Sequence, residues 1–288
     1  MTRIIGSLAE VASDYDVLFC DLWGCVHNGI RAYPAAVAAL QAFRGGGGQV
    51  CLMTNAPRPA AQVEASFERL GIPRDAWDVI VTSGDAAQDA MFAGAVGRKV
   101  WHLGPAKDDA FFEVPPEWKD AAPIERVDLE EAEGIVCTGP FDEENEAPED
   151  YRARLMIARE KGLGLLCANP DIVVDLGERR IYCAGAIAEF YTELGGESLY
   201  FGKPHPPIYD LARRKLGIRE GARVLAIGDG INTDIAGATG EEVDSIFITG
   251  GLAAEHMGAD VENPDAAQMD EWLRQRLIAP TFAMGRLR

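Results

Sequence analysis

The stretch VLAIGDGINTDIAGA covers residues 224–238 and joins an unbroken apolar run to a glycine-rich turn with two acids. The run, residues 224–227, shows no polar alternation, which is typical of a strand covered on both faces of a parallel sheet. Asp229 and Asp234 follow it, and carboxylates in this position suit Mg²⁺. Asp and Gly are also common in plain turns, and Asp234 could cap a helix, so this stretch alone leaves both interpretations open.

Apolar runs of the same kind recur elsewhere in the chain, each followed by polar or glycine residues. They span residues 17–20, 50–53, 79–81 and 245–248, with amphipathic stretches at 35–43, 60–70 and 208–216. Strands that alternate with helices in this way predict an α/β fold with a doubly wound, Rossmann-like parallel sheet. Ligands bind at the carboxyl ends of such strands. We therefore expect Asp21, Thr54 and Asp229, which follow three of the runs, to lie close together.

The middle of the chain has its own strand signals. Apolar runs at residues 100–103, 134–137 and 164–167 are separated by acidic and proline-rich loops. A region of roughly 100 residues is large enough for a domain. We predict a core domain from residues 1–95 and 197–288, and an inserted α/β domain from 96–196. The glycine run at 45–48 lacks the GK[ST] ending of a nucleotide-binding P-loop and is predicted to connect a helix to a strand.

The composition argues against partners with a negative surface. Lys and Arg number 27 and Asp and Glu number 46, which gives a formal charge of −19. Such a chain repels phosphate backbones and anionic lipids, so we expect neither nucleic-acid binding nor membrane association. It also follows that a phosphorylated substrate needs a local positive centre in the protein.

The sequence also indicates a cytoplasmic location. It shows neither a signal peptide nor an apolar stretch of the roughly 18 residues that a membrane span requires. The six cysteines form no CxxC pair, and most lie in or beside apolar runs. Buried thiols in a reducing compartment explain them better than a zinc site or a disulfide framework.

Three further segments contain candidate site residues. DLWGCVHNG (21–29) begins with Asp21, Thr54-Asn55 follows the second apolar run, and FGKPHPPIY (201–209) contains Lys203. Each has an ordinary interpretation, as a turn residue, a helix N-cap or a surface lysine. Their chain order, acid, Thr, Lys and then GD…D, resembles the four motifs of the haloacid dehalogenase superfamily. CANPD (167–171), GAIAEF (185–190) and GKPHPPIY resemble its class IIA branch of p-nitrophenyl phosphatase-like enzymes, whose larger cap domain lies between the second and third motifs.

This resemblance implies a role for each matching residue. Asp21 would attack phosphorus and form an aspartyl-phosphate. Mg²⁺ would be held by Asp21, the main-chain carbonyl of Trp23, Asp229 and Asp234. Thr54 and Lys203 would bind the phosphoryl oxygens and complete the catalytic set. Asn55 and Gly24 are expected to contact the phosphate as well.

The resemblance also suggests what surrounds the reacting phosphate. The substrate is expected to be a small phosphorylated molecule, and the cap would exclude water and select the leaving group. Candidate substrate contacts are His27, Asn169, Asp171, Ala184, Gly185 and Ala186. A homodimer is possible from the resemblance alone.

One position departs from the superfamily pattern. Most of its phosphatases have a second Asp two residues after the nucleophile, which protonates the leaving group, and here that residue is Trp23. An indole N–H does not transfer a proton at neutral pH, and general acid–base catalysis contributes roughly 10²–10⁴ in rate. His27 is a candidate replacement. The alternatives to an ordinary phosphatase are therefore a phosphotransferase or hydrolase limited to activated phosphates or phosphonates, and a weakened phosphate-binding regulatory protein.

Overall fold

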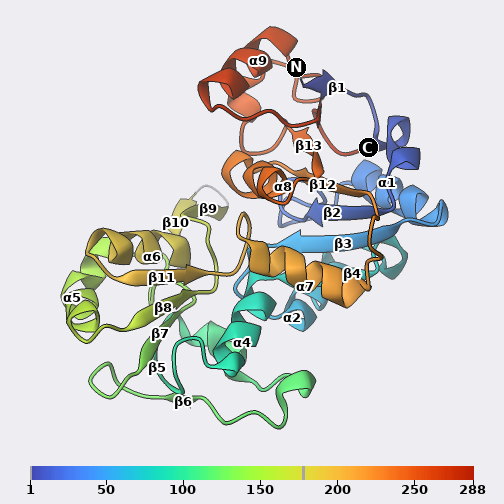
Figure 1. Cartoon of the computed structure of the whole chain (residues 1–288). Helices are drawn as coiled ribbons and strands as arrows, with labels where there is room; N and C mark the ends of the chain where they lie inside the picture. The colour runs from blue at the N-terminus through green and yellow to red at the C-terminus, as the bar shows by residue number, and fades with distance from the viewer. Residues whose placement is uncertain (1, 177–178) are drawn as a thin grey trace. The chain divides into compact units, whose positions relative to one another are not determined.

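The computed structural model describes residues 2–176 and 179–288 and confirms the α/β fold (Figure 1). The chain forms two compact units. The first comprises the residues up to Thr54, Ala61–Val81 and Lys203–Arg288, and the second comprises Asn55–Ala60 and Thr82–Gly202. The second unit is thus wider at both ends than the inserted domain predicted for residues 96–196.

The first unit is built on a seven-stranded sheet with the order β1-β14-β13-β12-β2-β3-β4. The strands in this order are β1 (Arg3–Ile4), β14 (Phe282–Met284), β13 (Asp244–Ile248), β12 (Val224–Gly228), β2 (Val17–Asp21), β3 (Gln49–Thr54) and β4 (Val79–Thr82). The pairings from β1 through β3 are parallel. All five residues of β2 and of β12 are buried, which explains why their sequences are apolar without alternation.

The register of the central strands brings their carboxyl ends together. Cys20 of β2 lies opposite Ile227 of β12, and Asp21 lies opposite Met53 of β3. The residues that follow these three strands therefore share one edge of the sheet, as the sequence predicts.

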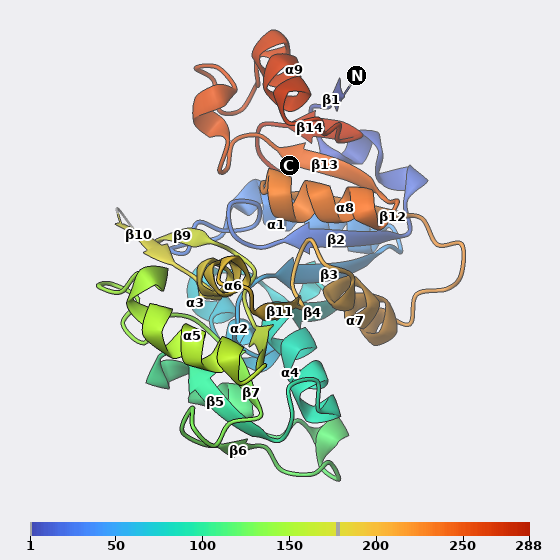
Figure 2. The same ribbon diagram turned by 60° about the vertical axis from the view of Figure 1, so that its left-hand side comes forward.

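Helices cover both faces of this sheet. α1 (Pro34–Gly45) lies on one face, and α7 (Pro206–Leu216) and α8 (Ala236–Gly240) lie on the other (Figure 2). The single helix predicted over residues 60–70 is instead two short ones, α2 (Ala60–Glu64) and α3 (Phe67–Leu70). The Ser66 hydroxyl donates to the Val63 carbonyl at 2.7 Å, a local bond that competes with continuous helix. α9 (Ala266–Gln275) packs Met269 and Leu273 in one cluster with Phe247 of β13 and Ala283 of β14.

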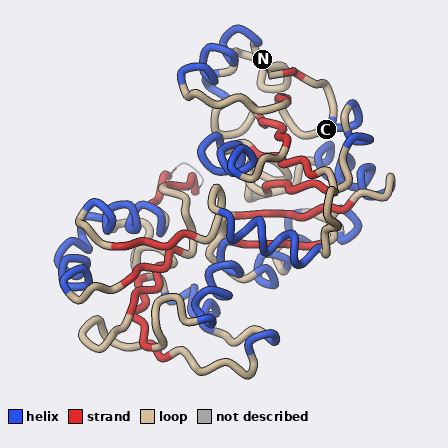
Figure 3. Tube along the Cα trace, viewed as in Figure 1, coloured by secondary structure: helices blue, strands red, loops and turns tan. Residues whose placement is uncertain are grey.

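The second unit contains a five-stranded parallel sheet and a separate hairpin, drawn in red in Figure 3. The sheet strands in spatial order are β11 (Glu197–Tyr200), β8 (Gly164–Cys167), β7 (Gly134–Cys137), β5 (Lys99–Leu103) and β6 (Glu125–Arg126). The hairpin pairs β9 (Val173–Leu176) with β10 (Arg179–Tyr182). Alternate residues of β7 enter different cores. Ile135 packs with residues of α5 (Arg152–Glu160) and α6 (Ala184–Glu193), and Val136 packs with residues of α4 (Ser83–Ala93).

Short 3₁₀ helices complete both units. They are η1 (Leu8–Glu10), η2 (Ala12–Asp14), η3 (Arg74–Ala76), η4 (Ala106–Phe112), η5 (Pro116–Trp118), η6 (Pro148–Tyr151) and η8 (Ala254–His256). All six cysteines are free thiols and are buried, as predicted. Among the described residues, none of the helices has the length and apolar character needed to span a membrane.

An ion pair beside β4 gives a first testable prediction. Arg44 donates to both carboxylate oxygens of Asp78, at 2.9 and 2.5 Å, and the Val50 amide donates to Asp78 at 2.8 Å. Burial raises the pKa of Asp78, but these bonds outweigh it and hold the pKa below its usual value. Asp78→Asn should lower the free energy of unfolding by about 1.5–3 kcal/mol at pH 7, as expected for hydrogen bonds to a charged group.

The pH dependence of this loss follows from the direction of the shift. A carboxyl with a lowered folded-state pKa stabilises the fold above its unfolded pKa, and this contribution disappears as the pH falls through the folded value. Urea unfolding of wild type and Asp78→Asn should therefore differ at pH 7 and converge in acid below about pH 4. A constant difference across this range would show that the ionised pair is not the cause.

Candidate active site

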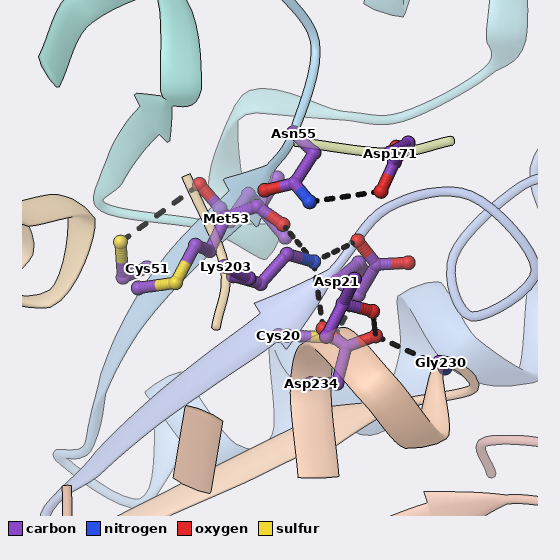
Figure 4. Close-up of polar contacts among 11 residues, drawn as sticks. Cys20, Asp21, Cys51, Met53, Asn55, Asp171, Lys203, Gly230 and Asp234 are labelled. Atoms are coloured by element: carbon purple, nitrogen blue, oxygen red, sulfur yellow. Dashed lines mark hydrogen bonds and ion pairs between the residues drawn. The ribbon is translucent and has the colours of Figure 1, made fainter. Parts of the chain in front are cut away.

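Four of the predicted site residues meet at the carboxyl edge of the first unit's sheet, and Figure 4 labels three of them, Asp21, Lys203 and Asp234. The Lys203 ammonium group donates to Asp21 Oδ1 at 2.5 Å, to Asp234 Oδ1 at 2.6 Å and to the Met53 carbonyl at 3.3 Å. Asp229 completes the group, and ligand atoms of Asp21, Cys25 and Asp229 lie within 4.8 Å of one another. Asp21 and Asp229 come together because β2 and β12 are neighbours in the sheet. Asp234 joins them from η7, and Lys203 joins them from the turn before α7.

Local backbone structure positions the two late carboxylates. Asp234 lies in a π-helical turn, η7 (Ile231–Ile235), and accepts from the Gly230 amide at 3.1 Å. Asp229 accepts from the Leu252 amide at 3.1 Å. π-Helical turns are rare and occur frequently at functional sites.

Glycines make room for the Asp229 carboxylate. A Cβ at Gly24 would lie 2.1 Å from Asp229 Oδ2, and a Cβ at Gly251 would lie 2.0 Å from the same atom. The two backbones therefore close around this carboxylate from the loops after β2 and β13. Gly24 has φ +78°, a left-handed conformation that favours glycine independently of space.

The cluster holds more negative charge than positive charge. Asp21, Asp229 and Asp234 are 8%, 5% and 5% exposed, and Lys203, 4% exposed, is the cation among them. Burial raises the pKa of Asp21 well above its usual range, despite the opposing effect of Lys203, and the neighbouring carboxylates add to this. Burial and Asp234 raise the pKa of Asp229 to about 7. The Lys203 pKa is also raised, because Asp21 and Asp234 outweigh the effect of its burial.

These residues fit a divalent cation. Three buried carboxylates around one ammonium group leave uncompensated negative charge, which a bound cation would neutralise. The donors beside Asp229 are hard oxygens, the type that Mg²⁺ prefers. The thiol of Cys25, 1% exposed, is the remaining member of the cluster, and its pKa is raised well above the usual value, chiefly by burial. A protonated thiol is a poor ligand, so the carboxylates are the better metal donors.

The other predicted phosphate and substrate contacts are distributed over both units. Thr54 ends β3 and is half-buried. Asn55 belongs to the second unit, where its amide donates to Asp171 Oδ1 at 2.9 Å. Asn169 Oδ1 accepts from the Asp171 amide at 3.0 Å. Their roles toward a substrate stay predictions.

The predicted contacts at the start of α6 are tightly packed. Ala184, Gly185 and Ala186 are buried, and a Cβ at Gly185 would lie 2.3 Å from the Pro170 carbonyl oxygen. Gly185 therefore packs against the backbone of the segment that carries Asn169 and Asp171. Direct contact of these three residues with a substrate remains a prediction.

The loop after Asp21 contains two aromatic residues with different environments. His27 is 7% exposed, and its Nδ1 accepts from the Gly29 amide at 2.9 Å. Burial, helped by the Arg69 charge, lowers the pKa of His27 to about 4. At pH 7 the ring is neutral, which argues against His27 as the replacement proton donor. Trp23 is 47% exposed.

Sequence reasoning missed three members of the cluster, namely Cys25, the Leu252 amide and the Met53 carbonyl. Backbone groups leave no trace in side-chain identity. The pair Gly250-Gly251, one residue after an apolar run, was the available signal for a close backbone approach near Leu252.

A substitution at Gly251 tests the close fit around Asp229. In Gly251→Ala the new methyl would overlap the Asp229 carboxylate, so we expect about 1–3 kcal/mol of destabilisation and weaker Mg²⁺ binding. Urea unfolding and calorimetric titration with Mg²⁺ measure both effects. Gly240→Ala, on α8 with open space around its Cβ, is the matched control and should behave like wild type. Equal Mg²⁺ affinity in all three proteins would contradict the placement of the cation beside Asp229.

The sequence and the fold match known hydrolases. Residues 18–113 match the family model "Haloacid dehalogenase-like hydrolase", and residues 200–271 match the model "HAD-hydrolase-like". None of the curated proteins matches the sequence.

Three solved structures illustrate the similarity. A haloacid dehalogenase-like hydrolase from Brucella suis 1330 is 40% identical with a TM-score of 0.83, covering 99% of this chain and 100% of that one. A 4-nitrophenylphosphatase from Thermotoga maritima is 19% identical with a TM-score of 0.70, covering 95% of each chain. A glycerol phosphate phosphatase from Mycobacterium tuberculosis, in complex with magnesium, is 23% identical with a TM-score of 0.67, covering 95% of this chain and 76% of that one.

The first of these relatives spans nearly the whole chain at an identity that establishes common family membership, and the two family models agree with it. The second unit interrupts the core sequence between β3 and Lys203, which is the position of the cap in class IIA members. The chain therefore belongs to the haloacid dehalogenase-like hydrolase family, in its class IIA branch.

Proposed function

We propose that this chain is a Mg²⁺-dependent phosphatase that hydrolyses a small phosphorylated metabolite through a phosphoryl group on Asp21. The observation that carries the proposal is the buried cluster of Asp21, Asp229 and Asp234 around Lys203. Phosphatases among the structures of similar fold, one of them in complex with magnesium, support the same reaction class.

The first step would use Asp21 as the nucleophile. A carboxylate oxygen of Asp21 forms a bond to phosphorus, the bond between phosphorus and the leaving-group oxygen breaks, and the electron pair remains on that oxygen. Lys203 already donates to Asp21 and can also donate to a phosphoryl oxygen bound beside it, together with the Thr54 hydroxyl. Mg²⁺ held by Asp21, Asp229 and the Trp23 carbonyl would supply further positive charge at the phosphoryl group.

The second step would return the enzyme to its starting state. The oxygen of a water molecule forms a bond to phosphorus, and the bond between phosphorus and the Asp21 oxygen breaks with its electron pair left on the carboxylate. Both protons of the water leave with the inorganic phosphate. Asp234, fixed by Lys203 and the Gly230 amide, is placed to orient water near the carboxylate cluster.

Trp23 favours a narrower version of this function. Its indole cannot protonate a leaving group, so alkyl phosphates, which leave as poor alkoxides, should react slowly. Aryl, acyl or enol phosphates and phosphonates depend less on this proton. A hydrolase or phosphotransferase restricted to such activated substrates is therefore the second candidate.

A phosphate-binding regulatory protein is the third candidate, and one assay separates all three. Phosphate release is measured from p-nitrophenyl phosphate, acetyl phosphate, sugar phosphates, nucleoside monophosphates and pyridoxal phosphate, each with Mg²⁺ and with a chelator. We expect turnover that needs Mg²⁺ and falls at least about 100-fold from aryl to alkyl phosphates. Equal rates on both classes would remove the restriction, and phosphate binding without turnover would favour the regulatory protein.

A further inference from the structure

The loop that carries Trp23 is folded tightly beside the carboxylate cluster. The Gly24 amide donates to the His27 carbonyl at 2.9 Å, and the His27 amide donates to the Leu22 carbonyl at 3.1 Å. Gly24, the residue after Trp23, closely approaches Asp229 Oδ2. These contacts fix the Trp23 backbone beside the cluster, two residues after Asp21.

The indole ring is held by the turn that follows. A Cβ at Gly29 would lie 2.4 Å from Trp23 Cη2, so the benzo ring rests directly on the Gly29 backbone. Gly29 has φ +83°, and its amide donates to His27 Nδ1 at 2.9 Å. The His27 ring meets the indole edge-on, with centroids 5.5 Å apart and planes at 76°. The position of the ring is thus determined by two neighbours.

Despite these contacts, 47% of Trp23 remains exposed. A tryptophan offers one of the largest stacking surfaces among side chains, and a planar ring placed on it gains an offset-stacked contact. Gly29, in a left-handed conformation, and the buried His27 orient an indole ring that is only half covered. This arrangement suits a side chain that completes its contacts with a ligand.

We propose that Trp23 is a specificity-determining residue that stacks on the planar ring of the leaving group, so that the preferred substrates are phosphate monoesters of aromatic hydroxyl compounds. This inference rests on the proposed function, because it places the reacting phosphate at Asp21. It also fits the chemistry at this position. An aryloxide spreads its negative charge over the ring and departs without a proton from residue 23.

Ligand binding to a variant without the nucleophile tests stacking on the Trp23 indole separately from turnover. In an Asp21→Asn background with Mg²⁺, calorimetry gives the affinities for phenyl phosphate and cyclohexyl phosphate, which share ring size and charge but differ in planarity. We expect phenyl phosphate to bind about two- to tenfold more tightly, the range that an aromatic stacking contact supplies. A further Trp23→Leu change should bring the ratio to about one, Trp23→Phe should preserve it, and Ile30→Ala, an exposed residue in the same loop, should leave it unchanged.

The orientation of the ring is tested by Gly29→Ala. The added methyl would displace the indole from its seat, so the preference for phenyl phosphate should fall while Trp23 is still present. A ratio that survives both Trp23→Leu and Gly29→Ala overturns the proposal. If wild type releases no phosphate from any ester but the ratio of the two affinities still depends on Trp23, the proposed function fails and the stacking role of Trp23 is supported. If wild type turns over substrate but the affinity ratio does not change in Trp23→Leu, the proposed function is supported and the stacking role of Trp23 fails.

Discussion

Replacing Lys203 with methionine is expected to abolish turnover and to lower the free energy of unfolding by about 3–5 kcal/mol, the range for removing one partner of a buried ion pair. Lys203 is 4% exposed and donates to both Asp21 and Asp234, so its loss leaves buried carboxylates without their cation. Urea denaturation and phosphate-release assays measure the two effects. Lys119→Met, at an exposed position in the second unit, should change stability by no more than about 0.5 kcal/mol.

Two further measurements separate charge from packing at this position. The raised pKa values of Asp21 and Asp229 imply that Mg²⁺ should partly restore the stability of Lys203→Met, because a second cation compensates the same carboxylates. Acid should have a similar effect, since protonation removes the repulsion. A stability of Lys203→Met close to that of wild type would mean that the cluster does not depend on this ammonium group.

Asp21→Asn is expected to reduce turnover by at least about 10⁴-fold, as observed when nucleophiles are removed from covalent catalysts. The amide lacks the nucleophilic oxygen but has nearly the same shape. Lys203 keeps its 2.6 Å bond to Asp234, so the variant should remain folded. Circular dichroism provides the check on folding, and the same substrate panel provides the check on rate. Retained turnover in a folded Asp21→Asn protein would place the nucleophile elsewhere.

Apolar runs were sufficient to predict the central strands of both units. β2, β3, β12 and β13 are buried on both faces, and burial of this kind leaves a continuous apolar signature that short windows reveal. β1 and β14 left no such signal, because they contain two and three residues and are defined by pairing between the two ends of the chain.

Local sequence could not determine the limits of the second unit. Helix α4 was assigned to the core by the strand–helix pattern, but Met91 and Phe92 pack with Val136 and Leu166 of the second unit's sheet. This assignment depends on long-range packing and carries no local signature. The split between α2 and α3 likewise depends on how Ser66 bonds to the backbone.

The proximity of the polar side chains could be predicted in part, because the carboxyl ends of parallel strands meet at one edge of the sheet in this fold. Asp21, Thr54 and Asp229 were expected to meet because they follow neighbouring runs, and the resemblance added Lys203 and Asp234. The bonds of Lys203 and the glycines around Asp229 show that Asp21, Lys203, Asp229 and Asp234 form one cluster. The neutral state of His27 could not be predicted from the sequence, since it depends on burial and on the hydrogen bond that the Gly29 amide donates to its Nδ1.

Trapping the covalent intermediate tests the central claim most directly. The protein is mixed with p-nitrophenyl phosphate and Mg²⁺, quenched in acid within the first turnovers, digested and analysed by mass spectrometry. Since Trp23 provides no general base for the second step, the phosphorylated form should accumulate. We predict one added phosphoryl group on the peptide that contains Asp21, and none in Asp21→Asn. Steady phosphate release without this label, or with the label on another residue, would contradict the account.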